Sequence, residues 1–129
     1  MKNPFDDLPV IFNYTREQAL ADGVLVDLSD WAREVGFVIP VACTKSLWHR
    51  YLSPSDELKP FGQSERGRAH DMLFMLATAI RRSGNDDRVY FRTIFLQSPN
   101  RHVTVDLKAQ CGPGDDGEPV VTVMLPDED

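Results

Sequence analysis

Apolar and polar side chains alternate most clearly in the last third of the chain. Between residues 102 and 109 every second residue is apolar, which is the pattern of a strand with one buried face and one face in water. Segments 88–96 and 120–125 are rich in β-branched and aromatic residues and predict strands before and after it. The connections 97–101 and 110–119 suit an antiparallel meander with one tight and one wide loop.

A helical pattern precedes this meander. From Ser64 to Arg82 apolar residues recur three and four positions apart, which predicts one long helix. Phe74, Met75 and Ala77 widen its apolar surface almost to a full circle, so we expect the helix to be covered on most sides. The predicted fold class is therefore α+β, with an antiparallel C-terminal β-meander packed against one long helix.

The first half of the chain predicts short strands and short helices. We expect strands over Val10–Tyr14, Val24–Leu28 and Phe37–Thr44. We expect a helix over 15–21 that begins with a capping box of Thr15 and Gln18. Two further helices are expected, over 30–35 with Ser29 as its N-cap and Gly36 as its left-handed end, and over 45–52 with Thr44 as its N-cap. Pro40 demotes its strand to an edge or an extended segment, because proline has no N–H to donate. Ser53–Gln63 is the one candidate for a mobile linker, too short to separate two domains, and we expect 1–129 to form a single domain.

The composition is typical of a soluble domain that folds without disulfide bonds or a structural metal ion. The chain has 129 residues, of which 42% are hydrophobic and 26% charged. It has no apolar stretch of the ~20 residues that cross a bilayer and no signal-peptide pattern, so we expect a cytoplasmic protein that does not bind membranes. Cys43 and Cys111 are 68 residues apart, and the three histidines lack metal-ligand spacing. We expect no catalytic residue, no cofactor and no metal site.

Negative charge is concentrated at the C-terminal end. All 14 Lys and Arg residues lie between Lys2 and Lys108, whereas six acids follow them without any basic residue among them and equal the net charge of −6. These acids are Asp115, Asp116, Glu118, Asp127, Glu128 and Asp129. Such a surface repels the phosphates of nucleic acid and attracts a basic partner. A structural interpretation is that acids at turns and termini simply keep the protein in solution.

Three separated motifs carry a resemblance. They read NYTREQALADGVLVDLSDWAREVGFVIPVACT, GRAHDMLFMLATAIRR and GPGDDGEPVVTVMLPDED. With them the chain, from about residue 13 to its end, resembles an uncharacterised bacterial family, a domain of unknown function carried mostly by plasmids, phages and other mobile elements. The resemblance implies that the protein is encoded on a mobile element, and it assigns no catalytic residue. Small acidic proteins of mobile elements often occupy the nucleic-acid site of a restriction or CRISPR complex, and this analogy concerns lifestyle only.

The sequence therefore predicts a non-enzymatic binding protein of a mobile element. Its six C-terminal acids would inhibit a host defence complex, of the anti-CRISPR or anti-restriction type, by contacting a basic surface of a host protein or ribonucleoprotein. Direct binding to nucleic acid is not favoured. One alternative is a small enzyme or ligand-binding domain with a pocket around Tyr14, Arg16 and Asp27, although cap and turn residues explain the same motif. Another alternative is a nucleic-acid-binding accessory protein using the basic segment from Arg81 to Arg101.

Overall fold

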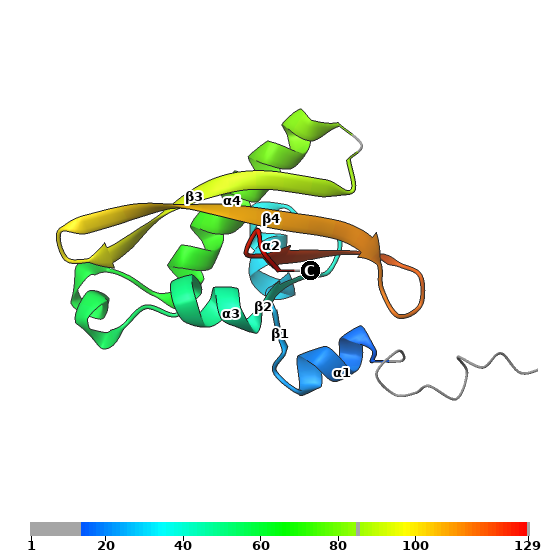
Figure 1. The fold of residues 1–129 in the computed structure, drawn as a ribbon, viewed down its shortest axis with the longest axis horizontal. Coiled ribbons are helices and arrows are strands. Elements are labelled where there is room, and N and C mark those ends of the chain that lie inside the picture. The colour runs from blue at the N-terminus through cyan, green and yellow to red at the C-terminus, as the bar shows by residue number, and fades with distance from the viewer. Residues whose placement is uncertain (1–13, 85, 129) are drawn as a thin grey trace, which may run out of the picture.

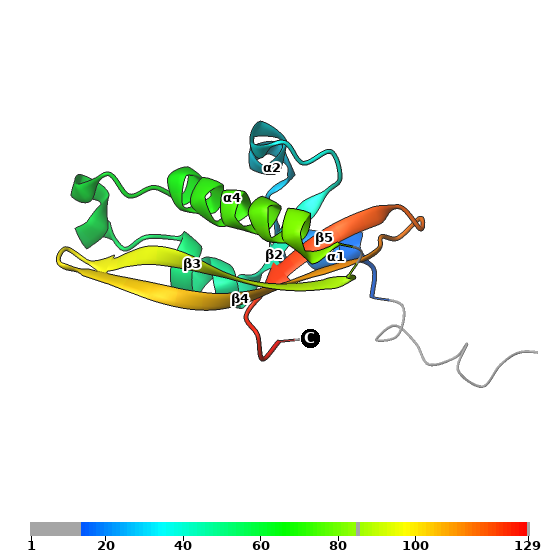
Figure 2. The same cartoon turned by 90° about the horizontal axis from the view of Figure 1, so that it is seen from above.

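The computed structural model describes residues 14–84 and 86–128, which form a five-stranded sheet with helices mainly on one face (Figures 1 and 2). The strands are β1 (Leu25–Asp27), β2 (Val41–Thr44), β3 (Arg88–Ser98), β4 (Arg101–Pro113) and β5 (Pro119–Met124), and their order in the sheet is β1-β2-β5-β4-β3. The strand expected over Val10–Tyr14 lies outside the described residues except for Tyr14, which is not in a strand.

The C-terminal meander is present and antiparallel. β3 pairs with β4, and β4 pairs with β5. β4 is longer than its pattern predicts, so the wide loop shrinks to residues 114–118, which we call the β4–β5 loop. Because β5 pairs only with the second half of β4, from Lys108 onward, the β3–β4 hairpin extends beyond β5 as an arm (Figure 1). The predicted α+β class, with a C-terminal meander against one long helix, is confirmed.

Helix α4 (Glu65–Ser83) lies across one face of the sheet, and α2 (Ser29–Val35) lies on the same side (Figure 2). The Ser64 hydroxyl accepts a hydrogen bond from Gly67 N at 3.0 Å and so caps the first turn of α4. The expectation that α4 is covered on most sides is wrong, because Phe74 and Met75 remain 61% and 42% exposed. The sheet and α2 together cover only part of the helix circumference.

The short N-terminal helices form where expected, with one difference in capping. Helix α1 (Arg16–Ala21) has both hydrogen bonds of the capping box between Thr15 and Gln18. Gly36 ends α2 in the left-handed conformation at φ 114°. Ser29, however, does not cap α2, because its hydroxyl is bonded to the backbone of Val41 in the neighbouring strand. The side chain of Asp27 takes the Ser29 N–H instead.

Strand β2 lies inside the sheet, and residues 37–40, which include Pro40, precede it outside any strand, so of the two alternatives predicted for this segment the edge strand is wrong. β2 pairs antiparallel with β1 and parallel with β5. It begins one residue after Pro40, so no proline N–H is needed in the ladder, and the Pro40 carbonyl accepts from Val121 N at 2.9 Å. This parallel pair joins the N-terminal half of the chain to the meander.

The segment after β2 is more structured than its sequence suggests. Thr44 caps α3 (Lys45–Leu47) as expected, and the helix then widens into the π-helical turn η2 (Trp48–Leu52). Much of the expected mobile linker forms the 3-10 helix η3 (Asp56–Phe61), whose Leu58 is 3% exposed. The burial of Leu58 fixes the segment to the core and makes the linker prediction wrong.

No helix of residues 14–84 and 86–128 combines the length and the apolar character that crossing a bilayer requires. The free thiol of Cys43 lies in the core, where burial raises its pKa to about 12. Cys111 is also free and is exposed on β4. Cys43 is therefore a packing residue of β2, because burial suppresses formation of the reactive thiolate.

Candidate functional site

The β4–β5 loop is attached to α1 by one of the six candidate acids. The Asp115 carboxylate accepts hydrogen bonds from the backbone N–H groups of Arg16 at 2.8 Å and Glu17 at 2.9 Å, at the start of α1. These two bonds are the main cause that lowers the pKa of Asp115 below its ordinary value. The loop itself turns through Gly117, whose φ of 84° favours glycine. Asp115 thus joins two segments about a hundred residues apart in the sequence.

Arg16 is the cation around which this end of the molecule is organised. Its guanidinium donates to the Thr122 hydroxyl at 2.6 Å and to the Val121 carbonyl at 3.0 Å, both in β5. Partial burial lowers the pKa of Arg16, while the nearby carboxylates of Asp27, Asp115 and Glu118 oppose that shift. Three carboxylates therefore surround one arginine, and the balance of charge here remains negative.

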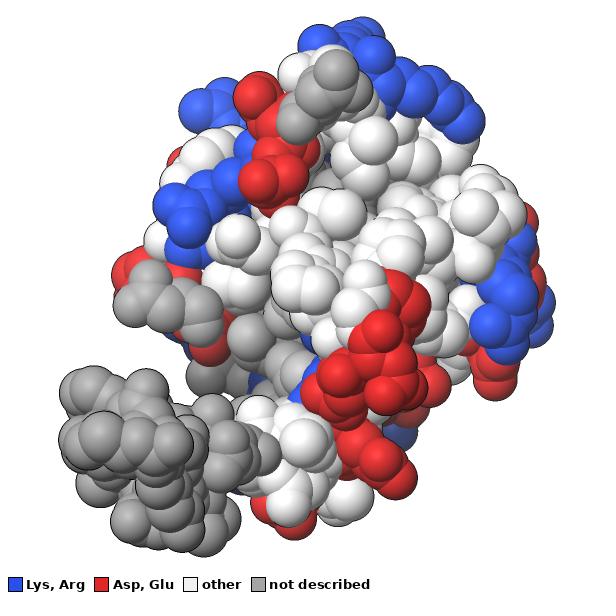
Figure 3. Space-filling model, turned by 90° about the vertical axis from the view of Figure 1, so that its right-hand side faces the viewer, with Lys and Arg blue, Asp and Glu red and all other residues white. Residues whose placement is uncertain are grey.

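Tertiary structure enlarges the acidic cluster of the loop. Asp27 of β1 lies with Asp115 and Glu118 close enough to Arg16 for their charges to act on it. Glu17 of α1 donates its backbone N–H to Asp115, and Asp116 is the next residue of the same loop. We call these five acids the α1 acidic patch. Figure 3 views the molecule from the side of the β4–β5 loop and shows one large cluster of Asp and Glu side chains below its centre, with smaller acidic groups and most Lys and Arg toward the margins. All five acids of the patch are exposed.

The acids at the C-terminal end lie elsewhere. β5 separates them from the β4–β5 loop by roughly 17 Å, at a rise of about 3.3 Å per residue. Glu128 is half-buried and accepts from the Thr44 hydroxyl at 2.7 Å and from Leu125 N at 2.9 Å. Asp127 is exposed, and Asp129 lies outside the described residues. The five described acids of the predicted six thus lie at two ends of β5 and do not form one continuous row.

The side chain of Lys108 holds the C-terminal segment against β4. The alternating pattern places Lys108 on the wet face of β4, but it is only 5% exposed, so this expectation is wrong. The segment after β5 folds over that face, and Lys108 Nζ donates to the carbonyls of Pro126 and Glu128. Among the described residues no Lys or Arg forms an ion pair with any of the five acids that belong to the six predicted ones. The carboxylates of these five acids therefore face solvent or accept hydrogen bonds from neutral donors, and no described Lys or Arg neutralises them.

The residues proposed for a ligand pocket act as local structural contacts. Tyr14 donates its hydroxyl to Asp22 at 2.8 Å, and Asp27 accepts from Ser29 N at 2.9 Å. Among the described residues, none of Tyr14, Arg16 and Asp27 lines any of four well-formed cavities. In the described part of the chain, no three His, Cys, Asp or Glu side chains come close enough to hold a metal ion. The pocket alternative gains no support from this geometry.

The basic segment from Arg81 to Arg101 is spread over the molecule. Arg81 and Arg82 end α4, and Arg101 begins β4 at the far tip of the hairpin, roughly 33 Å along β3 from Arg88. Arg92 is also paired with Asp106 at 2.7 Å. A continuous basic track for nucleic acid is therefore not assembled, and this alternative gains no support either.

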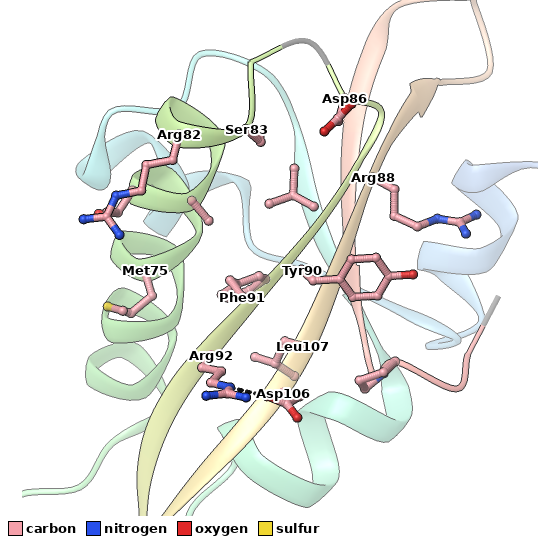
Figure 4. Close-up of a pocket in the computed structure, with 14 residues that line it drawn as sticks. Met75, Arg82, Ser83, Asp86, Arg88, Tyr90, Phe91, Arg92, Asp106 and Leu107 are labelled. Atoms are coloured by element: carbon pink, nitrogen blue, oxygen red, sulfur yellow. Dashed lines mark hydrogen bonds and ion pairs between the residues drawn. The ribbon is translucent and has the colours of Figure 1, made fainter.

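A groove of about 830 Å³ runs along the free edge of β3 beside α4 (Figure 4). In Figure 4 Phe91 lies between the strand and the helix, while Arg88 and Tyr90 extend to the other side of β3. The sequence analysis missed this groove. The one available signal was the residue pattern of β3, in which the exposed Tyr90 and Ile94 alternate with buried residues at an edge strand.

Comparison with known proteins gives one match. A family model described as "Family of unknown function (DUF6573)" matches residues 1–129. No curated protein and no solved structure matches the chain.

Proposed function

Since the chain belongs to the DUF6573 family of unknown function, we propose that it is a non-enzymatic binding protein of a mobile element that inhibits a host defence complex. In this proposal its acidic surface contacts a basic, nucleic-acid-binding surface of a host protein or ribonucleoprotein, of the restriction or CRISPR type. The mobile-element habitat rests on the resemblance of its motifs. The mechanism is electrostatic competition with nucleic acid for the same basic surface.

One observation carries the proposal. The described acids of the two C-terminal clusters have no Lys or Arg ion-pair partner in residues 14–84 and 86–128, and two further acids join the cluster at the β4–β5 loop. Internal neutralisation by arginines of the same chain would have left no anionic surface for a partner. Arg16, the cation inside the α1 acidic patch, is outnumbered there by carboxylates.

The structure sharpens the choice of residues for a test. Asp115 and Glu128 hold the fold through hydrogen bonds, so their replacement mixes stability with binding. Asp116, Glu118 and Asp127 are exposed, and the described hydrogen bond of the Glu118 carboxylate is accepted from Asp116 N in its own loop. The triple variant Asp116→Asn, Glu118→Gln, Asp127→Asn therefore lowers the charge with little effect on packing.

The experiment first captures host proteins on the wild-type chain and then measures association rates with each purified partner at several salt concentrations. The expected result is a rate that falls as salt rises and that is about tenfold lower for the triple variant at low salt. A matched control carries the same change of net charge elsewhere, with Glu57→Gln, Asp86→Asn and Asp87→Asn. Equal rates for the triple variant and the wild type contradict the proposal.

A further inference from the structure

Arg68 is a buried arginine whose hydrogen bonds all go to neutral oxygens. It lies in the second turn of α4 and is 6% exposed. Nε donates to the Tyr51 carbonyl at 2.6 Å, and Nη1 donates to Gln63 Oε1 and to the Leu96 carbonyl, each at 2.9 Å. The guanidinium thus links α4 to the end of η2 and to β3 without using a carboxylate.

One nitrogen of this guanidinium remains free. Nη2 has no hydrogen-bond partner among residues 14–84 and 86–128, although its two N–H groups are donors. Burial lowers the pKa of Arg68, and the charge of Asp71 opposes this only in part, without forming an ion pair with Arg68. A largely buried cation with two N–H donors that no described residue accepts can bind an anionic ligand with them.

Arg68 lines a cavity of about 410 Å³ between η2, η3 and the β3–β4 arm. Two arginines and two aromatic rings form a stack in its wall. The guanidinium carbon of Arg50 lies 5.4 Å from the centre of the Tyr51 ring, Tyr51 stacks on Phe95 at 5.5 Å, and Arg68 lies 5.1 Å from the centre of Phe95. This arrangement holds both guanidinium groups in place, because cation–π contacts and ring stacking restrict their motion.

The lining of this cavity is unusual for an acidic protein. The polar side chains in the wall include those of His49, Ser53, Ser55 and Gln97, and no Asp or Glu of the described residues lines the cavity. The adjoining cavity, which shares Arg50 and Tyr51, is lined by Asp106 and Asp127, and the charge of Asp71 acts on Arg68 from outside the lining. Within the protein's overall charge of −6 this cavity is a local positive site.

We propose that this cavity binds a small organic oxyanion, with the free Nη2 of Arg68 as its buried donor and Arg50 as a second cation at the rim. The ligand class is a molecule that carries a phosphate or carboxylate group, because the N–H donors of a charged guanidinium form their strongest hydrogen bonds with anionic oxygens. The cavity lies within the size range of small-molecule sites, about 300–1,000 Å³. This site is separate from the α1 acidic patch and adds a ligand to a protein otherwise proposed to bind a partner protein.

The test titrates the full chain with inorganic phosphate and, separately, with succinate, at constant ionic strength set with sodium chloride. Binding is followed by the NMR shifts of backbone amides and of the arginine Nε–H groups. We expect saturable shifts at His49, Ser53 and Gln97 and at the side chain of Arg68. Saturation by phosphate alone identifies phosphate as the preferred group, and saturation by succinate alone identifies a carboxylate. Shifts that stay linear up to ~0.1 M for both probes, as bulk screening produces, overturn the proposal.

Variants locate the site. Arg50 is exposed and makes no described hydrogen bond, so Arg50→Gln keeps the fold while removing a charge from the rim, and the dissociation constant should rise about tenfold. Arg81→Gln, which removes an equally exposed arginine at the end of α4, should leave it unchanged. An unchanged dissociation constant in Arg50→Gln contradicts the proposal even if Arg68 variants fail to fold.

Discussion

Arg16 and Arg68 are both withdrawn from water, but the two ends of the molecule compensate them differently. Arg16 is half-buried and lies among the carboxylates of Asp27, Asp115 and Glu118. Arg68 is 6% exposed and donates only to carbonyl and amide oxygens. Burial lowers the pKa of both arginines, and nearby carboxylates oppose the shift more extensively at Arg16.

This difference shows how one small domain can carry a negatively charged surface at one site and a positively charged cavity at another. At Arg16 the compensating acids exceed the cation, so the surface there is anionic and suited to a basic partner. At Arg68 neutral dipoles satisfy three donor contacts and leave the positive charge without an ion-pair partner. The same residue type therefore supports an acidic patch at one end and an anion-binding cavity at the other.

The largest expected effect comes from removing the more deeply buried cation. Arg68→Ala should lower the free energy of unfolding by about 3 kcal/mol, because it leaves the carbonyls of Tyr51 and Leu96 without their donor and opens a void beside Phe95. Urea denaturation followed by circular dichroism measures it. Arg66→Ala, which removes an exposed arginine from the same helix, is the control and should cost less than about 1 kcal/mol. A cost for Arg68→Ala no greater than that of the control would contradict the role assigned to burial.

A smaller loss is expected at the other buried arginine. Arg16→Ala removes the hydrogen bonds to Thr122 and Val121 and should lower the free energy of unfolding by about 1–2 kcal/mol. Its effect should be smaller than that of Arg68→Ala, because Arg16 keeps more contact with water. The same urea experiment ranks the two variants, and the reverse order would refute the comparison.

The third prediction concerns pH. The two backbone N–H groups on Asp115 lower its pKa in the folded state below that of the unfolded chain. Its contribution to stability is therefore complete above the unfolded pKa of about 4 and is lost as pH falls through the lower folded pKa. Asp115→Asn should lower the urea midpoint near about pH 7, by less than Arg16→Ala does, and should converge with the wild type near about pH 2. A gap that widens in acid would show that the sign is wrong.

The smallest effect is expected for an arginine that is paired but exposed. Arg92 contacts Asp106 at 2.7 Å, with both side chains more than half exposed. Arg92→Ala should change the free energy of unfolding by no more than about 0.5 kcal/mol, because water screens such a pair. Thermal unfolding of this variant provides the baseline for the two buried arginines. A loss as large as that of Arg68→Ala would mean that ion pairing, not burial, governs these contributions.

Much of the secondary structure is predictable because it depends on neighbours in the chain. The capping box of Thr15 and Gln18, the left-handed Gly36 and the cap of Thr44 all form as the local sequence predicts. The predictions fail where a distant segment intervenes. Ser29 is taken up by the next strand, and Lys108 is covered by the C-terminal segment.

The candidate site divides in the same way. The six C-terminal acids can be found from sequence because charge is a property of each residue, and their lack of neighbouring cations is visible in the chain. The separation of the five described acids by β5, the position of Asp27 near Arg16 and the contact of Glu17 with Asp115 cannot be found there. The Arg68 cavity gave no sequence signal, because an arginine in a long helix is most often exposed.

By itself, the sequence determined the helix and strand segments of the C-terminal half, the α+β class and the location of excess negative charge along the chain. Only the tertiary structure decided that β2 lies parallel to β5 inside the sheet, that Asp115 caps a helix about a hundred residues away, and that Arg68 is buried without an ion-pair partner. The physical reason is the distance along the chain over which each effect acts. Periodicity and caps act within a few residues, whereas burial and the local electric field depend on which distant segments pack together.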